Sequence, residues 1–192
     1  QSPYSVLFGG AQAGQLSTAP DNQFDQISLF GNYRHHRVNL QARLNYGQLT
    51  QTESFLPYSN NPFLATNQLP TAQLNGEIDP LSSHIKLQYK ADNKWKITAN
   101  YYLDHRENNT QTNQYQQVYT DSVALDDVTS NRPYSFKKVK VNLYSQYRFS
   151  IGSQLTVGWQ LDQRERDLQD REKTDNEKYW LKVSTRPAPC QC

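Results

Sequence analysis

The chain has 192 residues, enough for one good-sized domain, and its formal charge of +2 excludes strong electrostatic steering toward polyanions. Only 35% of the residues are hydrophobic and the mean hydropathy is −0.90, values that by themselves favour a poorly packed or disordered chain. The aromatic content of 12%, with 13 tyrosines, excludes a typical disordered composition and, together with many Gln, Asn and Thr, indicates β-structure with one wet face.

The N-terminal quarter of the chain predicts a loop followed by one hairpin. Residues 1–23 contain Gly, Pro and Asn without a sustained period, so we expect a loop there, with a short extended piece over residues 4–8. Residues 27–34 then alternate apolar and polar side chains, and residues 38–47 do so strictly. This period of two predicts strands, and "RHHR" at 34–37 predicts the short turn between them.

The rest of the chain repeats this rhythm of hairpins separated by long polar stretches. Five further segments alternate in the same way: residues 83–90, 94–106, 137–149, 154–164 and 178–184. The predicted short turns are 34–37, 91–93 and 150–153, and the predicted long loops are 51–81, 107–134 and 167–177. The total is seven strands with short connections at one end and long connections at the other.

Strand length favours a membrane barrel over a soluble sandwich. Most of the alternating segments are close to or above the ~9–11 residues that a tilted strand needs to cross a bilayer, whereas soluble domains prefer strands nearer ~5–6 residues. No run approaches the ~18 apolar residues of a transmembrane helix, but barrel strands give a much weaker signal. We therefore predict an all-β fold, an antiparallel up-and-down meander that forms a partial transmembrane β-barrel of about seven strands. A soluble β-sheet is the alternative.

The two faces of the predicted strands indicate different surroundings. Aromatic residues gather toward the ends of the apolar face, where a membrane-interface belt would hold them. The predicted interface aromatics are Tyr33, Tyr46, Tyr89, Trp95, Tyr147, Phe149 and Trp159. The opposite face carries charges that suit a hydrated lumen or the polar surface of a protein inside it. The predicted lumen- or partner-facing residues are Arg43, Lys86, Lys90, Lys96, Asp104, Lys138, Lys140 and Arg148.

The sequence predicts no catalytic, cofactor-binding or metal site. The adjacent His35 and His36 would point to opposite faces of a strand, so they are poor co-ligands unless the turn rearranges them. Cys190 and Cys192 stand two residues apart at the C-terminus, which makes a poor disulfide and half a metal site. The Asp-His-Arg cluster at 104–106 has no nucleophile or second carboxylate placed beside it by spacing, so we expect a protein that is not an enzyme.

The charged run at 161–180 does not predict a nucleic-acid site either. It holds five basic and seven acidic residues, a net charge of −2 (5 − 7), and such a segment does not gather phosphates. Leu168 is the only strong apolar residue between Leu161 and Tyr179, so a helix would have no stripe to bury. We expect the run to be the end of one strand and the loop to the next, and we expect no nucleic-acid partner.

Five stretches share features with one known family. They are "APDNQFDQISLFGNY" (19–33), "LNYGQLTQTESFLPY" (44–58), "NYYLDHRENNTQ" (100–111), "NRPYSFKKVKVNLYSQYR" (131–148) and "GWQLDQRERDLQDREKTDNEKYWLKV" (158–183). In this order they resemble the MtrB/PioB family, the outer-membrane barrel partners of decahaem cytochromes, over nearly all of residues 1–187. We interpret 1–192 as a single partial barrel segment, with a loop over 1–23, strands and loops over 24–187, and a tail at 188–192 outside the family pattern.

The resemblance carries expectations about function. It implies an outer-membrane scaffold that sheathes a multihaem c-type cytochrome for transmembrane extracellular electron transfer, in metal reduction or iron oxidation. The implied partners are periplasmic and extracellular multihaem cytochromes and the lipid of the bacterial outer membrane. Haem c is expected on the partner, because this sequence has no C-x-x-C-H attachment motif. The alternatives are a general outer-membrane porin and a soluble β-sheet binding module.

The resemblance also bears on the extent of the chain. Family members are much longer, and the chain resembles an internal piece of them. It shows no signal peptide, no counterpart of the family's N-terminal cysteine pair and no closing strand. We therefore expect a fragment or a truncated member.

Overall fold

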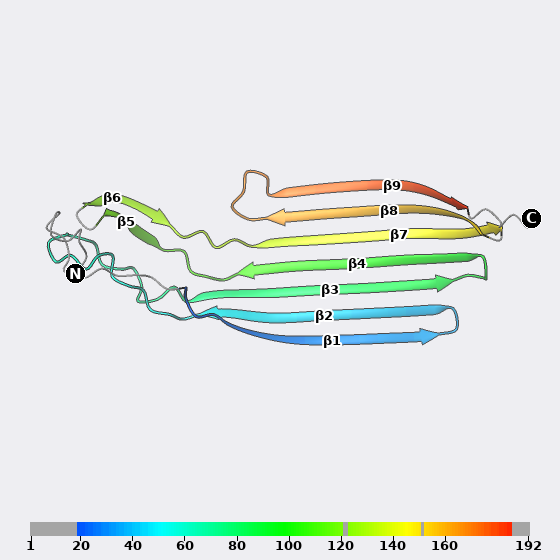
Figure 1. Ribbon diagram of the computed structural model, residues 1–192, viewed down its shortest axis with the longest axis horizontal. Helices are drawn as coiled ribbons and strands as arrows, with labels where there is room; N and C mark the ends of the chain where they lie inside the picture. Colours follow the sequence, from blue (N-terminus) through cyan, green and yellow to red (C-terminus); the bar gives the residue numbers. More distant parts are fainter. Residues whose placement is uncertain (1–18, 121–122, 151, 186–192) are drawn as a thin grey trace, which may run out of the picture. The chain divides into compact units, whose positions relative to one another are not determined.

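The computed structural model describes residues 19–120, 123–150 and 152–185 of the chain. The expectations for residues 1–18, for the 188–192 tail and for both cysteines lie outside this part. Every regular element in the described residues is a β-strand, and none of these residues forms a helix that could cross a membrane (Figure 1). The predicted all-β class is confirmed.

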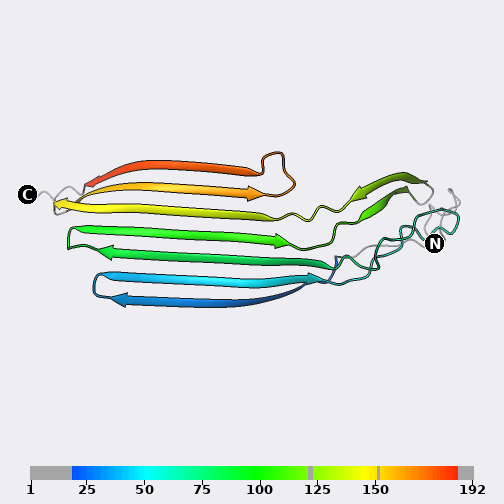
Figure 2. The ribbon, with the colours of Figure 1, turned by 180° about the vertical axis from the view of Figure 1, so that it is seen from behind.

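Nine strands are present in the described residues. They are β1 (Gln23–His35), β2 (Val38–Gln51), β3 (Gly76–Lys90), β4 (Trp95–Asn108), β5 (Gln114–Thr120), β6 (Val123–Ser130), β7 (Phe136–Ser150), β8 (Ser153–Arg166) and β9 (Lys173–Thr185). Seven form one sheet in the order β1-β2-β3-β4-β7-β8-β9, and β5 pairs with β6 in a separate sheet. Strands that follow one another therefore lie side by side, apart from the step from β4 to β7 (Figure 2). The predicted seven-stranded meander is confirmed.

The sheet has one end with short connections and one end with long ones. Two to four residues separate β1 from β2, β3 from β4 and β7 from β8, as predicted, and we call this the short-turn end. The opposite end, which we call the long-loop end, carries the connections from β2 to β3, from β4 to β7 and from β8 to β9. Within the described residues β1 and β9 pair on one side only, so the sheet is open.

The chain divides into two compact units. The sheet unit comprises Asp25–Gln48, Asp79–Glu107 and the described part of Tyr134–Cys192. The loop unit comprises the described part of Gln1–Phe24 together with Leu49–Ile78 and Asn108–Pro133. The β2–β3 and β4–β7 connections therefore have packing of their own, whereas the β8–β9 connection belongs to the sheet unit.

Cross-strand register sorts the side chains of the sheet unit into two faces. One row across β4, β7, β8 and β9 is apolar throughout: Trp95, Tyr147, Leu155 and Val183. The next row is polar throughout: Lys96, Gln146, Thr156 and Lys182. Because successive side chains of a strand point to opposite sides, these rows belong to opposite faces of the sheet. The sequence alternation therefore becomes an apolar face and a polar face.

The strands extend beyond the segments that alternate. β3 begins at Gly76 and β9 at Lys173, both inside stretches predicted as loops, so the predicted loops 51–81 and 167–177 were too long. The first six residues of β9 are polar on both faces, which hides them from a test of alternation. At ~3.3 Å per residue, the 14 residues of β4 span ~46 Å, more than the ~30 Å hydrocarbon core of a bilayer. Each long strand can therefore cross lipid and still project into water.

The loop unit contains a hairpin that the sequence did not predict. β5 and β6 pair antiparallel within the predicted loop 107–134, with register shifts on either side of Val118. The backbone N–H of Gln116 donates to the Tyr58 hydroxyl at 3.1 Å, and Gln116 Oε1 accepts from the Asn67 N–H at 2.6 Å. Side-chain hydrogen bonds thus tie the first two long connections together inside this unit.

Candidate functional site

The apolar face of the sheet unit is exposed although it carries large hydrophobic side chains. Leu143, Val157 and Leu181 lie on this face and are 45%, 49% and 67% exposed. No second layer of the described residues covers them, since all the strands of the sheet unit belong to one sheet. An exposed apolar surface of this extent marks contact with lipid or with another protein.

The predicted interface aromatics lie on or beside this face. Trp95 pairs with Tyr147 near the short-turn end, and the Trp95 indole N–H donates to Ser145 Oγ on β7. Because side chains alternate along a strand, Tyr46 and Tyr89 lie on the same face as the apolar residues of β2 and β3. Tyr33 likewise lies on the same face as Ile27 and Leu29 in β1. Phe149 lies at the register shift at the end of β7, and Trp159 lies in a row with Leu143, farther from the short-turn end.

The eight predicted lumen- or partner-facing residues share the other face. Lys96 pairs with Gln146, Asp104 with Lys138, and Tyr102 with Lys140. Arg148 pairs with Gln154. Hydrogen bonds from Asn39 to Gln88 (3.4 Å) and from Asn45 to Ser82 (2.9 Å) join polar side chains of β2 and β3. By alternation along the strands, these side chains lie on the same face as Arg43, Lys86 and Lys90. The sheet therefore gathers onto one surface charges that are far apart in sequence.

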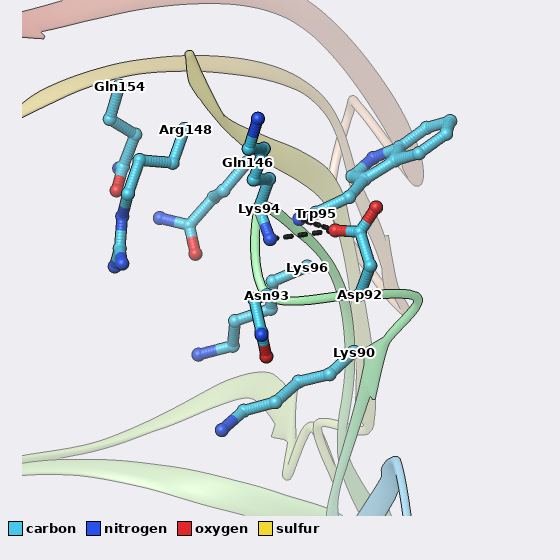
Figure 3. Close-up of a pocket in the computed structure, with 9 residues that line it drawn as sticks. All are labelled: Lys90, Asp92, Asn93, Lys94, Trp95, Lys96, Gln146, Arg148 and Gln154. Carbon is cyan, nitrogen blue, oxygen red and sulfur yellow. Dashed lines mark hydrogen bonds between the residues drawn. The ribbon is translucent and has the colours of Figure 1, made fainter. Parts of the chain in front are cut away.

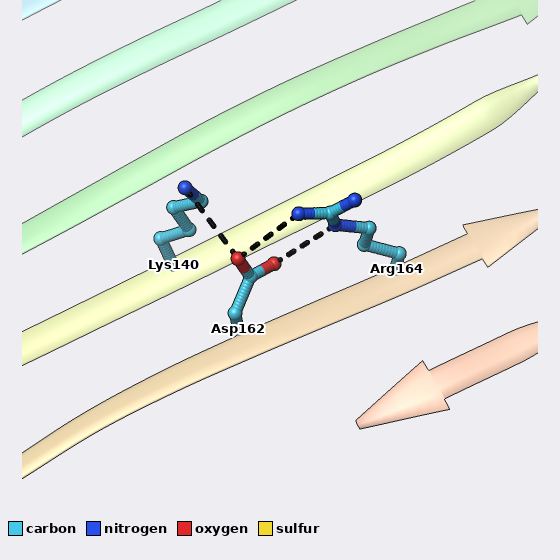
Figure 4. Close-up of polar contacts among 3 residues, drawn as sticks. All are labelled: Lys140, Asp162 and Arg164. Carbon is cyan, nitrogen blue, oxygen red and sulfur yellow. Dashed lines mark hydrogen bonds and ion pairs between the residues drawn. The ribbon is translucent and has the colours of Figure 1, made fainter. Parts of the chain in front are cut away.

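An ion-pair network holds the polar face together toward the long-loop end. Asp162 on β8 is only 8% exposed, and its carboxylate lies 3.4 Å from Lys140 Nζ and 3.2 Å from Arg164 Nε (Figure 4). The Arg164 guanidinium binds both carboxylate oxygens, with Nη2 donating at 3.3 Å. Among the predicted residues only Lys140 belongs to this network. Asp162 and Arg164 stand in the charged run at 161–180, which was interpreted without its cross-strand neighbours.

A cationic cleft of about 360 Å³ lies on the polar side of the short-turn end (Figure 3). Its lining includes four cations, Lys90, Lys94, Lys96 and Arg148, and one carboxylate, Asp92. Asp92 Oδ1 accepts from the backbone N–H groups of Lys94 at 2.7 Å and Trp95 at 2.6 Å, and so shapes the β3–β4 turn. Within the described residues, no ion pair joins any of the four cations to a carboxylate.

An aromatic row lies between these two regions on the same face. Register aligns Thr98, Tyr144, Gly158 and Trp180 across four strands. The Trp180 indole covers Gly158 so closely that a Cβ there would lie 2.3 Å from the ring, and its centroid lies 6.1 Å from that of Tyr144. Thr98 is fully buried at one end of the row. Trp180 was not among the predicted site residues, although its alternation with Tyr179 and Leu181 already assigns it to the polar face.

The turn between β1 and β2 brings His35 and His36 together. His36 has a positive φ of 46°, and its Nδ1 lies 2.6 Å from Nε2 of His35. The turn rearranges the two rings, which is the exception that the prediction for adjacent strand residues allowed. Two imidazoles do not complete a metal site, and no group of three or more His, Cys, Asp or Glu in the described residues could hold a metal ion.

Comparison with known proteins identifies the family. The sequence model of the MtrB/PioB outer membrane beta-barrel porins matches residues 3–190. The chain belongs to the MtrB/PioB family. It is also 30% identical, over 181 residues, to the protein named outer membrane protein MtrB of Shewanella baltica (strain OS185). The match covers 94% of this chain and 25% of that relative, so the chain spans about a quarter of the relative's length.

Membership of the MtrB/PioB family decides between the predicted classes. It places the chain in the outer membrane as part of a porin-like β-barrel and overturns the soluble binding module. The open seven-stranded sheet is the fold of a barrel segment. The family is one of porin-type barrels and not of enzymes.

Proposed function

We propose that this chain forms part of the wall of a barrel that sheathes a multihaem c-type cytochrome and lets electrons cross the outer membrane. The observation that carries the proposal is the pairing of an exposed apolar face with a continuous polar face on strands longer than a bilayer is thick. A barrel wall has this construction, because lipid requires an apolar exterior and every backbone hydrogen bond must be made within the protein.

The two faces take different roles in this proposal. The apolar face contacts lipid, and its aromatic residues near the short-turn end, Trp95 and Tyr147 among them, sit at the membrane interface. The polar face, with Arg43, Lys86, Asp104 and the other predicted charges, lines the interior and contacts the enclosed protein. Haem c belongs to that partner, since this sequence has no C-x-x-C-H motif.

The connections give the barrel its orientation. Outer-membrane barrels have short turns on the periplasmic side and longer loops outside the cell. The short-turn end then meets periplasmic cytochromes, and the loop unit with its β5–β6 hairpin meets extracellular ones. The chain itself has no catalytic role in this proposal. Its role is to exclude solvent and to position the haems of its partner.

A plain porin is the second candidate, and the polar face also supports it. The same charged and amide side chains would line a water-filled channel with no protein inside. The candidates differ in one property, since a sheathed barrel is plugged by its partner and a porin conducts.

The test is to extract the protein from outer membranes in mild detergent and purify it through a tag on the barrel. We expect c-type haem absorbance to co-purify in a fixed ratio, and we expect vesicles containing the complex to pass electrons from an internal dye to an external acceptor. A haem-free barrel that conducts small ions at once in planar bilayers would overturn the proposal and favour the porin.

A further inference from the structure

The cationic cleft at the short-turn end combines a concentration of positive charge with hydrogen-bond donors. Its lining has four cations and one carboxylate, and Gln146 and Gln154 add amide groups. Figure 3 shows the side chains of Lys90, Lys96 and Arg148 extending to the same side of the sheet. Gln146 lies between Lys96 and Arg148, and Gln154 lies beside Arg148. Asp92 keeps its negative charge while its Oδ1 accepts from two backbone N–H groups of the turn, so the lining has a net formal charge of +3 (4 − 1).

Three different strands build this concentration of charge. Lys96 is on β4, Arg148 on β7, and Lys90 on β3, and the β3–β4 turn closes by a backbone hydrogen bond from Ala91 N to Trp95 O at 3.0 Å. The backbone N–H of Arg148 donates to Lys94 O at 2.8 Å, which anchors the end of β7 beside the turn. The cations are therefore positioned by backbone pairing. The row of Lys96 also continues to Lys182 on β9, which adds a positive charge on the same face.

From this geometry we infer that the cleft binds an acidic segment of the protein enclosed by the barrel, through carboxylate side chains; this inference rests on the proposed function. Lysine and arginine form their strongest hydrogen bonds with oxyanions, and arginine can bind a carboxylate through two parallel N–H groups. Trp95 also lines the cleft, but the other strand residues of its lining, Lys90, Lys96, Gln146, Arg148 and Gln154, lie on the polar face, which favours a protein segment over a lipid headgroup as the ligand. A volume of about 360 Å³ has room for a few carboxylate side chains.

The closing experiment compares the wild type with Lys96→Gln/Arg148→Gln in the intact protein. The matched control is Lys137→Gln/Lys173→Gln, which removes the same charge from the opposite face at the long-loop end. The detergent-solubilised complexes are washed with rising NaCl, and the haem protein retained per barrel is measured. Altered migration of unheated samples in gels checks barrel assembly of all three proteins.

We expect the cleft variant to release its haem protein at about half the NaCl concentration that the wild type requires, because charge pairs weaken as salt screens them. The control should release it at the wild-type concentration. Equal release from all three proteins would overturn the inference and leave the proposed function standing.

A second outcome separates the two proposals. If the wild type carries no haem protein, the proposed function fails, and the anisotropy of fluorescein-labelled hexaglutamate bound to the same three barrels then decides the inference. Binding that is about ten-fold weaker to Lys96→Gln/Arg148→Gln than to the control supports a carboxylate site. Equal binding to both variants, or no binding to the wild type, overturns it.

Discussion

The two ends of the polar face both carry Lys and Arg side chains, but in the part of the chain that the structure describes these are ion-paired at one end and unpaired at the other. Toward the long-loop end, the nearly buried Asp162 forms ion pairs with both Lys140 and Arg164. At the short-turn end, Lys96 and Arg148 face an open cleft with no carboxylate paired to them in the described residues. Burying a charge requires a partner, whereas a cation in a wet cleft needs none. The paired region is therefore built for cohesion, and the unpaired region is available to a ligand.

The aromatic row between these two regions gives the largest expected effect. Gly158→Ala places a Cβ about 2.3–2.6 Å from Trp180 ring atoms, so the indole must leave its position over β8. We expect the free energy of unfolding to fall by about 2 kcal/mol, as overpacking typically costs. The measurement is urea unfolding of the intact protein in lipid vesicles, followed by tryptophan fluorescence.

Gly31→Ala is the matched control for this substitution. Gly31 lies in β1 with nothing within 4 Å of an added Cβ, so its stability should stay within about 0.5 kcal/mol of the wild type. Equal losses in the two variants would show that any strand glycine is costly and that the contact with Trp180 is unimportant.

Asp162→Asn removes both ion pairs of the paired region and has the second largest expected effect on stability. It leaves Lys140 and Arg164 without their carboxylate, and we expect a loss of about 1–2 kcal/mol, between the values for exposed and buried pairs. The same urea titration measures it. A double-mutant cycle with Lys140→Gln should give a smaller loss than the sum of the single changes, and strict additivity would contradict the network.

Lys96→Gln sharpens the comparison by removing a cation from the unpaired region. Like charges repel, so in a partner-free barrel we expect stability to be unchanged or to rise by about 0.5 kcal/mol at low salt. Between 20 mM and 500 mM NaCl the Debye length falls roughly five-fold. Urea titrations at these two concentrations should therefore show that the stability difference between Lys96→Gln and the wild type shrinks with salt. A clear loss of stability would mean that Lys96 has a structural partner.

Lys173→Gln has the smallest expected effect. Lys173 lies 3.9 Å from both Glu165 and Asp175, and all three side chains are about half exposed. Such pairs contribute about 0–0.5 kcal/mol, so the unfolding curve should overlay that of the wild type. A loss comparable to that of Asp162→Asn would show that exposure does not distinguish the two sets of ion pairs.

The sequence predicted the sheet because its central segments alternate without interruption. Residues 38–47 and 154–164 carry one apolar face each, and both lie within strands of the observed sheet. The β5–β6 hairpin escaped prediction because its register shifts around Val118 disrupt a period of two. The start of β3 escaped because Pro80 lies inside it, and proline inside a strand is uncommon.

The polar face was predictable, but the pairing on it was not. Alternation assigns Lys140 and Lys96 to one face and says nothing of their neighbours. Whether a cation meets a carboxylate depends on register, which aligns Lys140 with Asp162 across a hairpin 22 positions apart in number (162 − 140). The cleft likewise requires the ends of four strands, β3, β4, β7 and β8, to meet beside one turn. Single-strand patterns contain neither kind of information.

Trp180 also fixes the register of β9 against β8. β9 could in principle slide along β8 by two positions and keep each face correct, since the side-chain period is two. Such a slip would set the indole against Thr156 or Gln160 in place of Gly158, where a side chain would occupy its space. One glycine therefore fixes the alignment of an edge, and any strand added beyond β9 during assembly inherits that alignment.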